Sequence, residues 1–478
     1  MGDTEVEQGL GRKPRRGDRI PVEVLGYAAG GGLRGRYADP SGAYAVELRR
    51  GVPGSRVEVD VLWRRGNDLR GRVGEVLRAG PHAVAPACAH VPDCGGCSHQ
   101  DLAYAAQLEQ KRQVVERVLA GALPLEVPVE ATLGCERPWR YRNKMDFTFG
   151  ARRWIAAGEP ADLADDERDF ALGLHPAHQF AKVLDVGDCR IVFEEAEAIL
   201  ATARALAREL GLSAWDTRSQ TGLLRHLVLR RSWATGEVLV DLVTSAEAEA
   251  ELAPWFAGLL ARHPEVATAV QTIHTGVAKT ALGERTLVRH GPGHISERLG
   301  GFEFRLSAKS FFQTNTPQAE RLLAVVLEEA ALTGAERVLD LYCGVGSLTL
   351  PLARRAAHVS GHELVEEAVL DARATAERNG VANVDFVAGD VARTLAHGAR
   401  ADVVVVDPPR GGLHPDVTAA LAAAAPRRLV YVSCNVKSAA RDAAKLVEAG
   451  FRLVRVRPVD LFPHTPHCEC VLTLEGPA

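Results

Sequence analysis

The stretch VLDLYCGVGSLTL, residues 338–350, decides the fold of the C-terminal part of this 478-residue chain. It has the pattern of a buried strand, a turn containing Gly344 and Gly346, and the start of a helix. Glycines let the backbone turn tightly and approach a ligand, and the first turn of a helix offers free N–H groups. Because a lone G-x-G fits many nucleotide-binding folds, the stretch by itself predicts only one strand–turn–helix unit of a Rossmann-like sheet.

The segments around this stretch alternate between helical and strand patterns. Helical patterns cover residues 317–332, 347–356, 366–380, 418–426 and 438–450, and strand patterns cover residues 337–342, 358–364, 384–390, 401–409 and 427–434. This order predicts a doubly wound, mostly parallel sheet. Three of the strands end in an acid, namely Glu363, Asp390 and Asp407. With no G-x-G-x-x-G pyrophosphate loop, such acids favour S-adenosylmethionine over a dinucleotide as the ligand.

Upstream of residue 316 the patterns differ. Short β-rich runs separated by GGG, DPSG and PGS fill residues 17–76, which is typical of a small OB-like barrel. Mixed α+β patterns occupy residues 138–300. We therefore predict a multidomain α/β protein with a disordered tail at residues 1–13, an OB-like barrel at 14–79, a central α+β domain at 80–305 and a Rossmann-like domain at 306–478.

Composition and charge narrow the class of protein. No stretch approaches the roughly 18 consecutive apolar residues of a membrane span, and the polar start lacks a signal-peptide core, so we expect a cytoplasmic protein. Residues 1–80 carry 15 basic and 11 acidic side chains, whereas the rest of the chain carries 42 basic and 50 acidic ones. A basic N-terminal module suggests an anion-binding surface, although a solvated arginine-rich face would have the same composition.

Three of the nine cysteines form the pattern Cys88-x5-Cys94-x2-Cys97. In a large chain without a signal peptide, cysteines are more often metal ligands or catalytic thiols than disulfides. Four thiolates suit either an iron–sulfur cluster or zinc, and the spacing leaves both open. Cys434, in the segment YVSCN, stands alone between a strand pattern and a helix pattern, where a cysteine is more often core than nucleophile.

Five segments in order resemble the RNA 5-methyluridine methyltransferase family. They are SFFQTN at 310–315, LDLYCGVGSLTL at 339–350, DPPRGGL at 407–413, VSCN at 432–435 and FPHTPHCE at 462–469. The chain resembles the branch with an N-terminal TRAM domain and an iron–sulfur cluster, similar to 23S rRNA uracil-5-methyltransferases. The resemblance implies a class I S-adenosylmethionine-dependent methyltransferase domain at the C-terminus and a TRAM domain in the place of the barrel.

The resemblance also implies roles for individual residues. Cys434 takes the position of the family's nucleophile and Glu469 that of its base, while Gln313, Tyr342, Glu363 and Asp407 take cofactor positions. Independently of the resemblance, the place of Asp390 at the end of a strand pattern predicts a contact with the adenine edge. Cys189 matches a fourth ligand position, so the resemblance favours a [4Fe–4S] cluster held by Cys88, Cys94, Cys97 and Cys189. Ser347 stands where some relatives have asparagine, and His464 and His467 are expected only to shape their loop.

The chemistry explains why a cysteine and an acid are needed. C5 of uracil is too poor a nucleophile to take a methyl group from a sulfonium, but addition of a thiolate at C6 makes C5 enolate-like. A base must then remove the C5 proton so that the thiol can leave. Because Cys434 precedes a predicted helix, we expect the helix dipole to favour its thiolate.

The resemblance thus implies methylation of C5 of a uridine in structured RNA through a Cys434–C6 adduct, with 23S rRNA favoured and tRNA possible. RNA is the implied partner, without a membrane or an obligate protein partner. Arg140, Arg142, Asn143 and Lys144 form a basic patch for which RNA contact and an ordinary exposed strand face are both open.

Three other functions are weighed against this one. An RNA cytosine-5 methyltransferase has the same type of mechanism, but its usual motif cysteines differ from SCN. An amino-group methyltransferase would want an aromatic residue where Arg410 stands. A non-catalytic RNA-binding or folding factor would need neither Cys434 nor Glu469.

Overall fold

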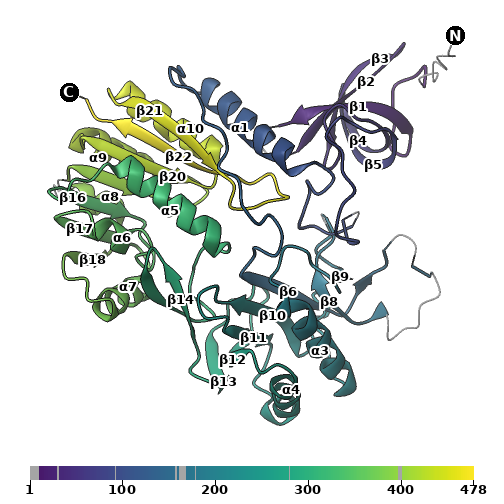
Figure 1. Cartoon of the computed structure of the whole chain (residues 1–478). Helices are drawn as coiled ribbons and strands as arrows, with labels where there is room; N and C mark the ends of the chain where they lie inside the picture. The colour runs from purple at the N-terminus through teal and green to yellow at the C-terminus, as the bar shows by residue number, and fades with distance from the viewer. Residues whose placement is uncertain are drawn as a thin grey trace.

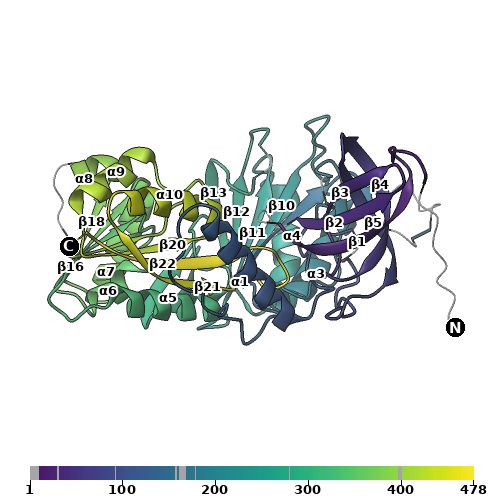
Figure 2. The same ribbon diagram turned by 90° about the horizontal axis from the view of Figure 1, so that it is seen from above.

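The computed structural model describes residues 10–28, 32–91, 93–156, 159–160, 168–177, 179–278, 280–396 and 401–477. Residues 1–9 of the predicted N-terminal tail therefore lie outside the described part of the chain. A small barrel, a central sheet and a C-terminal sheet form three neighbouring bodies (Figures 1 and 2). This arrangement confirms a multidomain α/β protein.

The N-terminal body is a closed barrel of five strands in the order β1-β2-β3-β5-β4. The strands are β1 (Arg19–Tyr27), β2 (Leu33–Asp39), β3 (Gly42–Leu48), β4 (Arg56–Arg65) and β5 (Asp68–Arg78). Buried and exposed residues alternate along them, so that Ile20, Val22 and Val59 face the barrel core. At Gly71 a Cβ atom would come within 2.1 Å of the Val59 side chain, so only glycine fits there. The prediction of an N-terminal barrel is confirmed.

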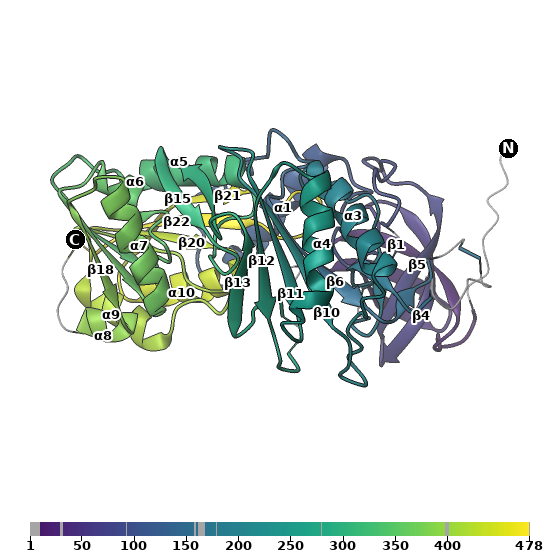
Figure 3. The ribbon, with the colours of Figure 1, turned by 90° about the horizontal axis from the view of Figure 1, so that it is seen from below.

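The central body is an eight-stranded sheet in the order β13-β12-β11-β10-β6-β8-β9-β7. Its strands are β6 (Lys144–Gly150), β7 (Arg153–Trp154), β8 (Ala171–Leu174), β9 (Val183–Asp185), β10 (Leu224–Arg231), β11 (Val238–Thr244), β12 (Val266–Ile273) and β13 (Arg285–His290). Helices α3 (Glu195–Glu209) and α4 (Glu249–Arg262) cover one face of it (Figure 3). A core that includes Phe147, Leu227 and Trp255 fills the space between them. The hairpin β14 (Ile295–Leu299) and β15 (Phe302–Leu306) follows.

The C-terminal body is a seven-stranded sheet in the order β18-β17-β16-β19-β20-β22-β21. The strands are β16 (Arg337–Leu341), β17 (His358–Glu363), β18 (Val384–Ala388), β19 (Val403–Val406), β20 (Arg428–Ser433), β21 (Arg452–Val459) and β22 (Glu469–Glu475). The helices are α5 (Thr316–Ala330), α6 (Thr349–Ala353), α7 (Glu366–Arg378), α8 (Val391–Ala396), α9 (Pro415–Ala424) and α10 (Val436–Glu448). The first five strands in this order are parallel and β22 is antiparallel, so the predicted doubly wound sheet is confirmed.

Helix α1 (Tyr104–Ala120) comes early in the chain but packs against the C-terminal sheet (Figure 1). Its residues Val115 and Leu119 share a core with Leu446 and Phe451. The chain that follows α1 then runs beside β21, where Val129 forms a bridge with Val456. An N-terminal segment thus completes the C-terminal body.

The parallel strands direct their carboxyl ends to one edge of the sheet. Strands β16, β17, β19 and β20 end there, and antiparallel β22 begins there at Glu469. Ligands of open α/β sheets bind at this kind of edge. Within the described part of the chain, every helix is too short or too polar to cross a bilayer.

Candidate active site

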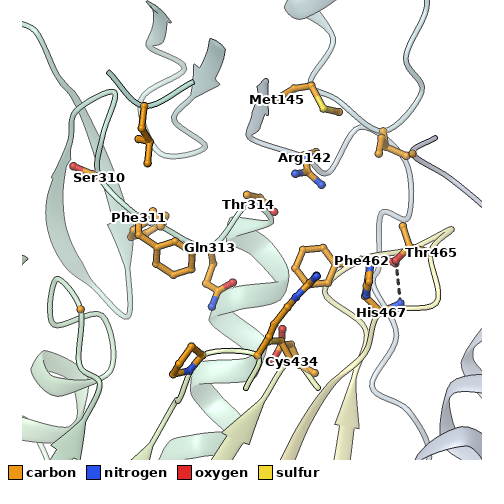
Figure 4. Close-up of a pocket in the computed structure, with 18 of the residues that line it drawn as sticks. Arg142, Met145, Ser310, Phe311, Gln313, Thr314, Cys434, Phe462, Thr465 and His467 are labelled. Atoms are coloured by element: carbon orange, nitrogen blue, oxygen red, sulfur yellow. Dashed lines mark hydrogen bonds between the residues drawn. The ribbon is translucent and has the colours of Figure 1, made fainter. Parts of the chain in front are cut away.

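A cavity of about 1720 Å³ lies at the carboxyl edge of the C-terminal sheet. Segments from different parts of the chain line it. The C-terminal domain contributes the SFFQTN segment, the glycine turn, the ends of β17, β19 and β20 and the start of β22. The central domain and the cysteine-rich segment supply the rest of the lining named here. In Figure 4, Phe311 and Gln313 lie on one side of it and Phe462, Thr465 and His467 on the other, with Cys434 below and between them. One cavity therefore joins the predicted cofactor and catalytic positions.

The glycine turn is held in a strained conformation at the floor of this cavity. Tyr342 has a φ of 65°, which is rare for a residue with a side chain, and Gly344 and Gly346 also have positive φ values. The Glu363 carboxylate accepts hydrogen bonds from the backbone N–H groups of Gly344 (3.1 Å) and Val365 (3.0 Å). Strand β17 thereby places an acid against the turn.

Four of the five predicted cofactor residues line the cavity, namely Gln313, Tyr342, Glu363 and Asp407. Asp390 is exposed and is absent from the residues that line it; its carboxylate accepts a hydrogen bond from Ala392 N at 2.8 Å at the start of α8. Burial raises the pKa of Asp407 to about 7. Glu363, Asp407 and Glu469 give the cavity an acidic floor, which suits a ligand that carries positive charge, such as a sulfonium.

Cys434 and Glu469 adjoin across two antiparallel strands. Ser433 at the end of β20 is the Cα partner of Cys470 in β22, so Cys434 and Glu469 are the next positions of the same register. Neighbouring positions of an antiparallel pair direct their side chains to the same side of the sheet, and both residues line the cavity. The fold thus brings a thiol and a carboxyl group to one point.

The charge balance around Cys434 differs from the sequence expectation. Cys434 lies just before α10, whose N-cap is Asn435, as the proposed dipole effect requires. Burial nevertheless raises the pKa of Cys434, and the nearby acids Glu469 and Asp407 raise it further. Arg410 opposes them through its charge and a side-chain hydrogen bond. The surroundings of Cys434 therefore raise its pKa overall, and Arg410 is the neighbour that stabilises the thiolate.

Glu469 is buried, with 4 % of its surface exposed. Burial and the charge of Asp407 raise the pKa of Glu469 to about 8, while Arg410 lowers it. An acid with such a pKa exchanges protons near neutral pH, which is what a general acid or base requires.

The four predicted metal ligands come from two segments, residues 88–97 and the segment that contains Cys189, and line the same cavity. Burial raises the pKa of Cys97 to about 12, and the neighbouring Cys189, Cys94 and Cys88 raise it too. Cys88 and Cys94 likewise raise the pKa of Cys189, so all four thiols lie within electrostatic reach of one another. Among the described residues, no group of three or more metal-ligating side chains is arranged to hold a metal ion. Four thiols are the donors that an iron–sulfur cluster or zinc requires, but the described residues do not gather them around one point.

The basic patch at residues 140–144 divides into separate roles. Asn143 is buried and donates hydrogen bonds to Gln313 O (2.9 Å) and Thr316 Oγ1 (2.8 Å), so it supports the SFFQTN segment. Arg140 forms ion pairs with Asp188 and Glu197. Arg142 lines the cavity.

Sequence reasoning missed the contact between Arg410 and Cys434. A signal was present, because Arg410 follows the DPP segment at the end of the strand next to β20.

Comparisons with known proteins agree with this geometry. The family model described as tRNA (uracil-5-)-methyltransferase matches residues 293–476. An uncharacterized RNA methyltransferase of Halalkalibacterium halodurans is 36 % identical over 90 % of this chain and 92 % of its own length. One of Porphyromonas gingivalis is 38 % identical over 88 % of this chain and 93 % of its own. The crystal structure of Pyrococcus abyssi tRNA (uracil-54, C5)-methyltransferase with S-adenosyl-L-homocysteine has a TM-score of 0.73 and 26 % identity, covering 95 % of this chain and all of that one.

Proposed function

The chain belongs to the RNA uracil-5-methyltransferase family, and from that premise we propose that Cys434 and Glu469 carry out methylation of C5 of a uridine in structured RNA. The observation that carries this proposal is the adjoining placement of the two residues in one cavity. When bound, S-adenosylmethionine supplies an electrophilic methyl group on a sulfonium. The acidic residues and the glycine turn offer the complementary surface, with Gln313, Tyr342, Glu363 and Asp407 as proposed contacts.

The first step requires a thiolate at Cys434. Arg410 stabilises this anion, and the proton that the thiol loses must pass to a base, for which the nearby Asp407 carboxylate or solvent is available. The thiolate adds to C6 of the uracil, which breaks the C5–C6 double bond and moves electron density to C5 and O4. C5 then takes up the methyl group, since it is now enolate-like.

The second step requires a base. After methyl transfer C5 carries both a methyl group and its original hydrogen. Glu469, as carboxylate, removes that proton; the C5–C6 double bond re-forms and Cys434 leaves as thiolate. A carboxylate whose pKa is near 8 is a stronger base than an ordinary glutamate.

A target base must leave its stack to reach Cys434. Phe311 is 74 % exposed and lines the cavity, which offers a face for an extruded base.

We propose that the five-stranded barrel is a TRAM-like domain that holds flanking phosphates, and that residues 80–305 and 306–478 act as the central and methyltransferase domains. We also propose that Asp390 contacts the adenine. Its charge adds to the effect of burial in raising the pKa of Tyr342, which shows that Asp390 lies near that residue of the cavity. The cytoplasm remains the expected location.

We propose 23S rRNA as the substrate, because the sequence resembles the branch with a TRAM domain and a cluster. tRNA is the second candidate, because the P. abyssi structure that covers this chain is that of a tRNA enzyme.

Cys88, Cys94, Cys97 and Cys189 are proposed to hold a [4Fe–4S] cluster, which would tie two distant chain segments together. Support comes from the four thiols lining one cavity and from the electrostatic influence by which they raise one another's pKa. Anaerobically purified protein should contain iron and sulfide and absorb visible light. The Cys189→Ser variant should lose the iron, the sulfide and the absorbance. Zinc without sulfide would contradict the cluster.

The test of the proposed reaction is tritium release from RNA that carries 5-tritiated uridine. With S-adenosylmethionine, the protein should release tritium from one of two transcripts, 23S rRNA or tRNA. Methyl transfer from labelled cofactor without tritium release from either transcript would contradict uracil-C5 chemistry.

A further inference from the structure

Residues 460–468, called the base loop, connect β21 to β22 and lead directly into Glu469. Val459, the last residue before the loop, is the Cα partner of Glu469. The loop therefore leaves and returns at one point of the sheet. Asp460, the first residue of the loop, therefore follows directly on the residue that pairs with Glu469.

The first anchor of the base loop is a buried ion pair with α1. Lys111 Nζ lies 2.5 Å from Asp460 Oδ1, and the two side chains are 3 % and 0 % exposed. Lys111 also donates a hydrogen bond to Phe462 O at 3.1 Å. Tyr104 donates its hydroxyl hydrogen to Asp460 Oδ2 at 2.9 Å. A buried charge pair of this kind is retained only with well-matched partners, and here every partner reaches the start of the base loop.

The second anchor lies at His464. Gln107, also on α1, accepts a hydrogen bond from His464 N at 2.9 Å, and its amide nitrogen lies 3.2 Å from His464 Nδ1. The His464 ring stacks on Trp139 at 3.7 Å, and its carbonyl accepts hydrogen bonds from Ser98 N and His99 N. His464 has a φ of 65°, a strained conformation that these contacts hold in place.

We infer that Lys111 and Gln107 are positioning residues for Glu469: helix α1, from the N-terminal part of the chain, holds the base loop so that the carboxyl group faces C5 of the uracil. The inference rests on the proposed function and deepens it. Neither α1 side chain lines the cavity, so both act through Asp460 and His464. Catalytic groups lose effectiveness steeply with displacement, and about 1 Å can cost roughly 100-fold in rate.

A structural role alone would alter stability without selecting one step of the reaction. The experiment therefore compares methyl transfer, followed with labelled cofactor, with release of tritium from 5-tritiated uridine in RNA. The main variant is the double substitution Lys111→Met/Asp460→Leu, which removes both charges and leaves neither one buried alone. Tyr104→Phe is a milder variant that removes one hydrogen bond from Asp460 and leaves the ion pair.

The folded double variant should transfer methyl groups within about threefold of the wild-type rate in a single turnover, while tritium release slows about 100-fold. A methylated protein–RNA adduct should accumulate meanwhile, because the thiol cannot leave. Tyr104→Phe should shift the ratio of the two rates in the same direction by a smaller factor. RNA affinity should be unchanged in both.

The matched control is Glu329→Gln. Glu329 is a buried acid of α5 that binds Arg457 of β21 and Thr473 of β22, away from the base loop. This substitution should lower the melting temperature and leave the ratio of methyl transfer to tritium release at the wild-type value.

Tritium release that keeps pace with methyl transfer in the double variant, or in Tyr104→Phe if the double variant does not fold, would overturn the inference. A wild-type protein that releases no tritium while it transfers methyl groups would instead contradict the proposed function. The two failures are therefore distinguishable.

Discussion

Cys434 and Glu469 occupy adjoining positions at the ends of antiparallel strands β20 and β22, one step beyond the Ser433–Cys470 pair. This register places the thiol and the carboxyl group in the lining of one cavity, and the proposed reaction needs both on the same uracil ring. Addition at C6 and removal of the C5 proton are separate steps, so the two residues should fail in different ways when they are replaced.

Cys434→Ala should reduce methylation to the background rate, because it removes the thiol beside Glu469 that is proposed to add to C6. RNA affinity in a filter-binding or anisotropy assay should stay within about threefold of wild type, since one half-buried thiol contributes little contact area. Cys135→Ala, a buried cysteine outside the cavity, is the matched control and should remain active. Equal loss of RNA affinity and activity in Cys434→Ala would indicate a structural cysteine.

Glu469→Gln should leave adduct formation possible and slow its breakdown by about 10² to 10⁴-fold, the usual contribution of a general base. A covalent protein–RNA complex that survives denaturing gel electrophoresis should therefore build up. Glu475→Gln, at the other end of the same strand, should turn over normally. Rapid turnover by Glu469→Gln would assign the base to another residue.

Arg410→Met should raise the pKa of Cys434, because it removes the neighbour that opposes Glu469 and Asp407. The pH profile of Cys434 alkylation by iodoacetamide should move to higher pH, with a slower reaction at pH 7. Arg441→Met, which removes a side-chain hydrogen bond to the neighbouring Gly411 carbonyl, is the control and should leave the profile in place. An unchanged profile in Arg410→Met would show that Arg410 does not stabilise the thiolate.

Binding of S-adenosylmethionine should release protons near pH 7. Burial holds the pKa of Glu469 at about 8 and that of Asp407 at about 7, so both are at least partly protonated in the free protein. A nearby sulfonium favours the carboxylates and lowers both pKa values, and protons then leave; neutral S-adenosylhomocysteine lacks this effect.

Calorimetry in two buffers of different ionisation enthalpy counts these protons. Release should be larger with S-adenosylmethionine than with S-adenosylhomocysteine and should shrink in Asp407→Asn. Equal release with both ligands would contradict the coupling. The same linkage implies that Glu469 becomes a stronger base after methyl transfer, because the sulfonium has then lost its positive charge and the pKa of Glu469 rises again.

The sequence allowed the C-terminal sheet to be predicted because its signals are local. Buried runs such as 403–406 are strands, and parallel strands must bring Glu363, Asp407 and Cys434 to one edge. The five-stranded barrel could be predicted for the same reason, from alternating residues and turn signals.

The remaining features depend on contacts between distant parts of the chain. Nothing in the local sequence shows that α1 binds the base loop through Lys111 and Asp460, or that Asn143 supports the segment with Gln313. The helix that follows Cys434 predicts a lowered pKa for this thiol. In the structure its pKa is raised instead, by burial and by acids that only the folded chain brings near.

RNA that contains 5-fluorouridine gives the most direct test of the central claim. Fluorine at C5 cannot be removed as a proton is, so the methylated adduct should persist. Mass spectrometry of the digested complex should find one methyl group and the modified nucleotide on the peptide with Cys434, and Cys434→Ala should form no complex. A nucleotide on another residue, or methylated RNA without any covalent complex, would contradict the account.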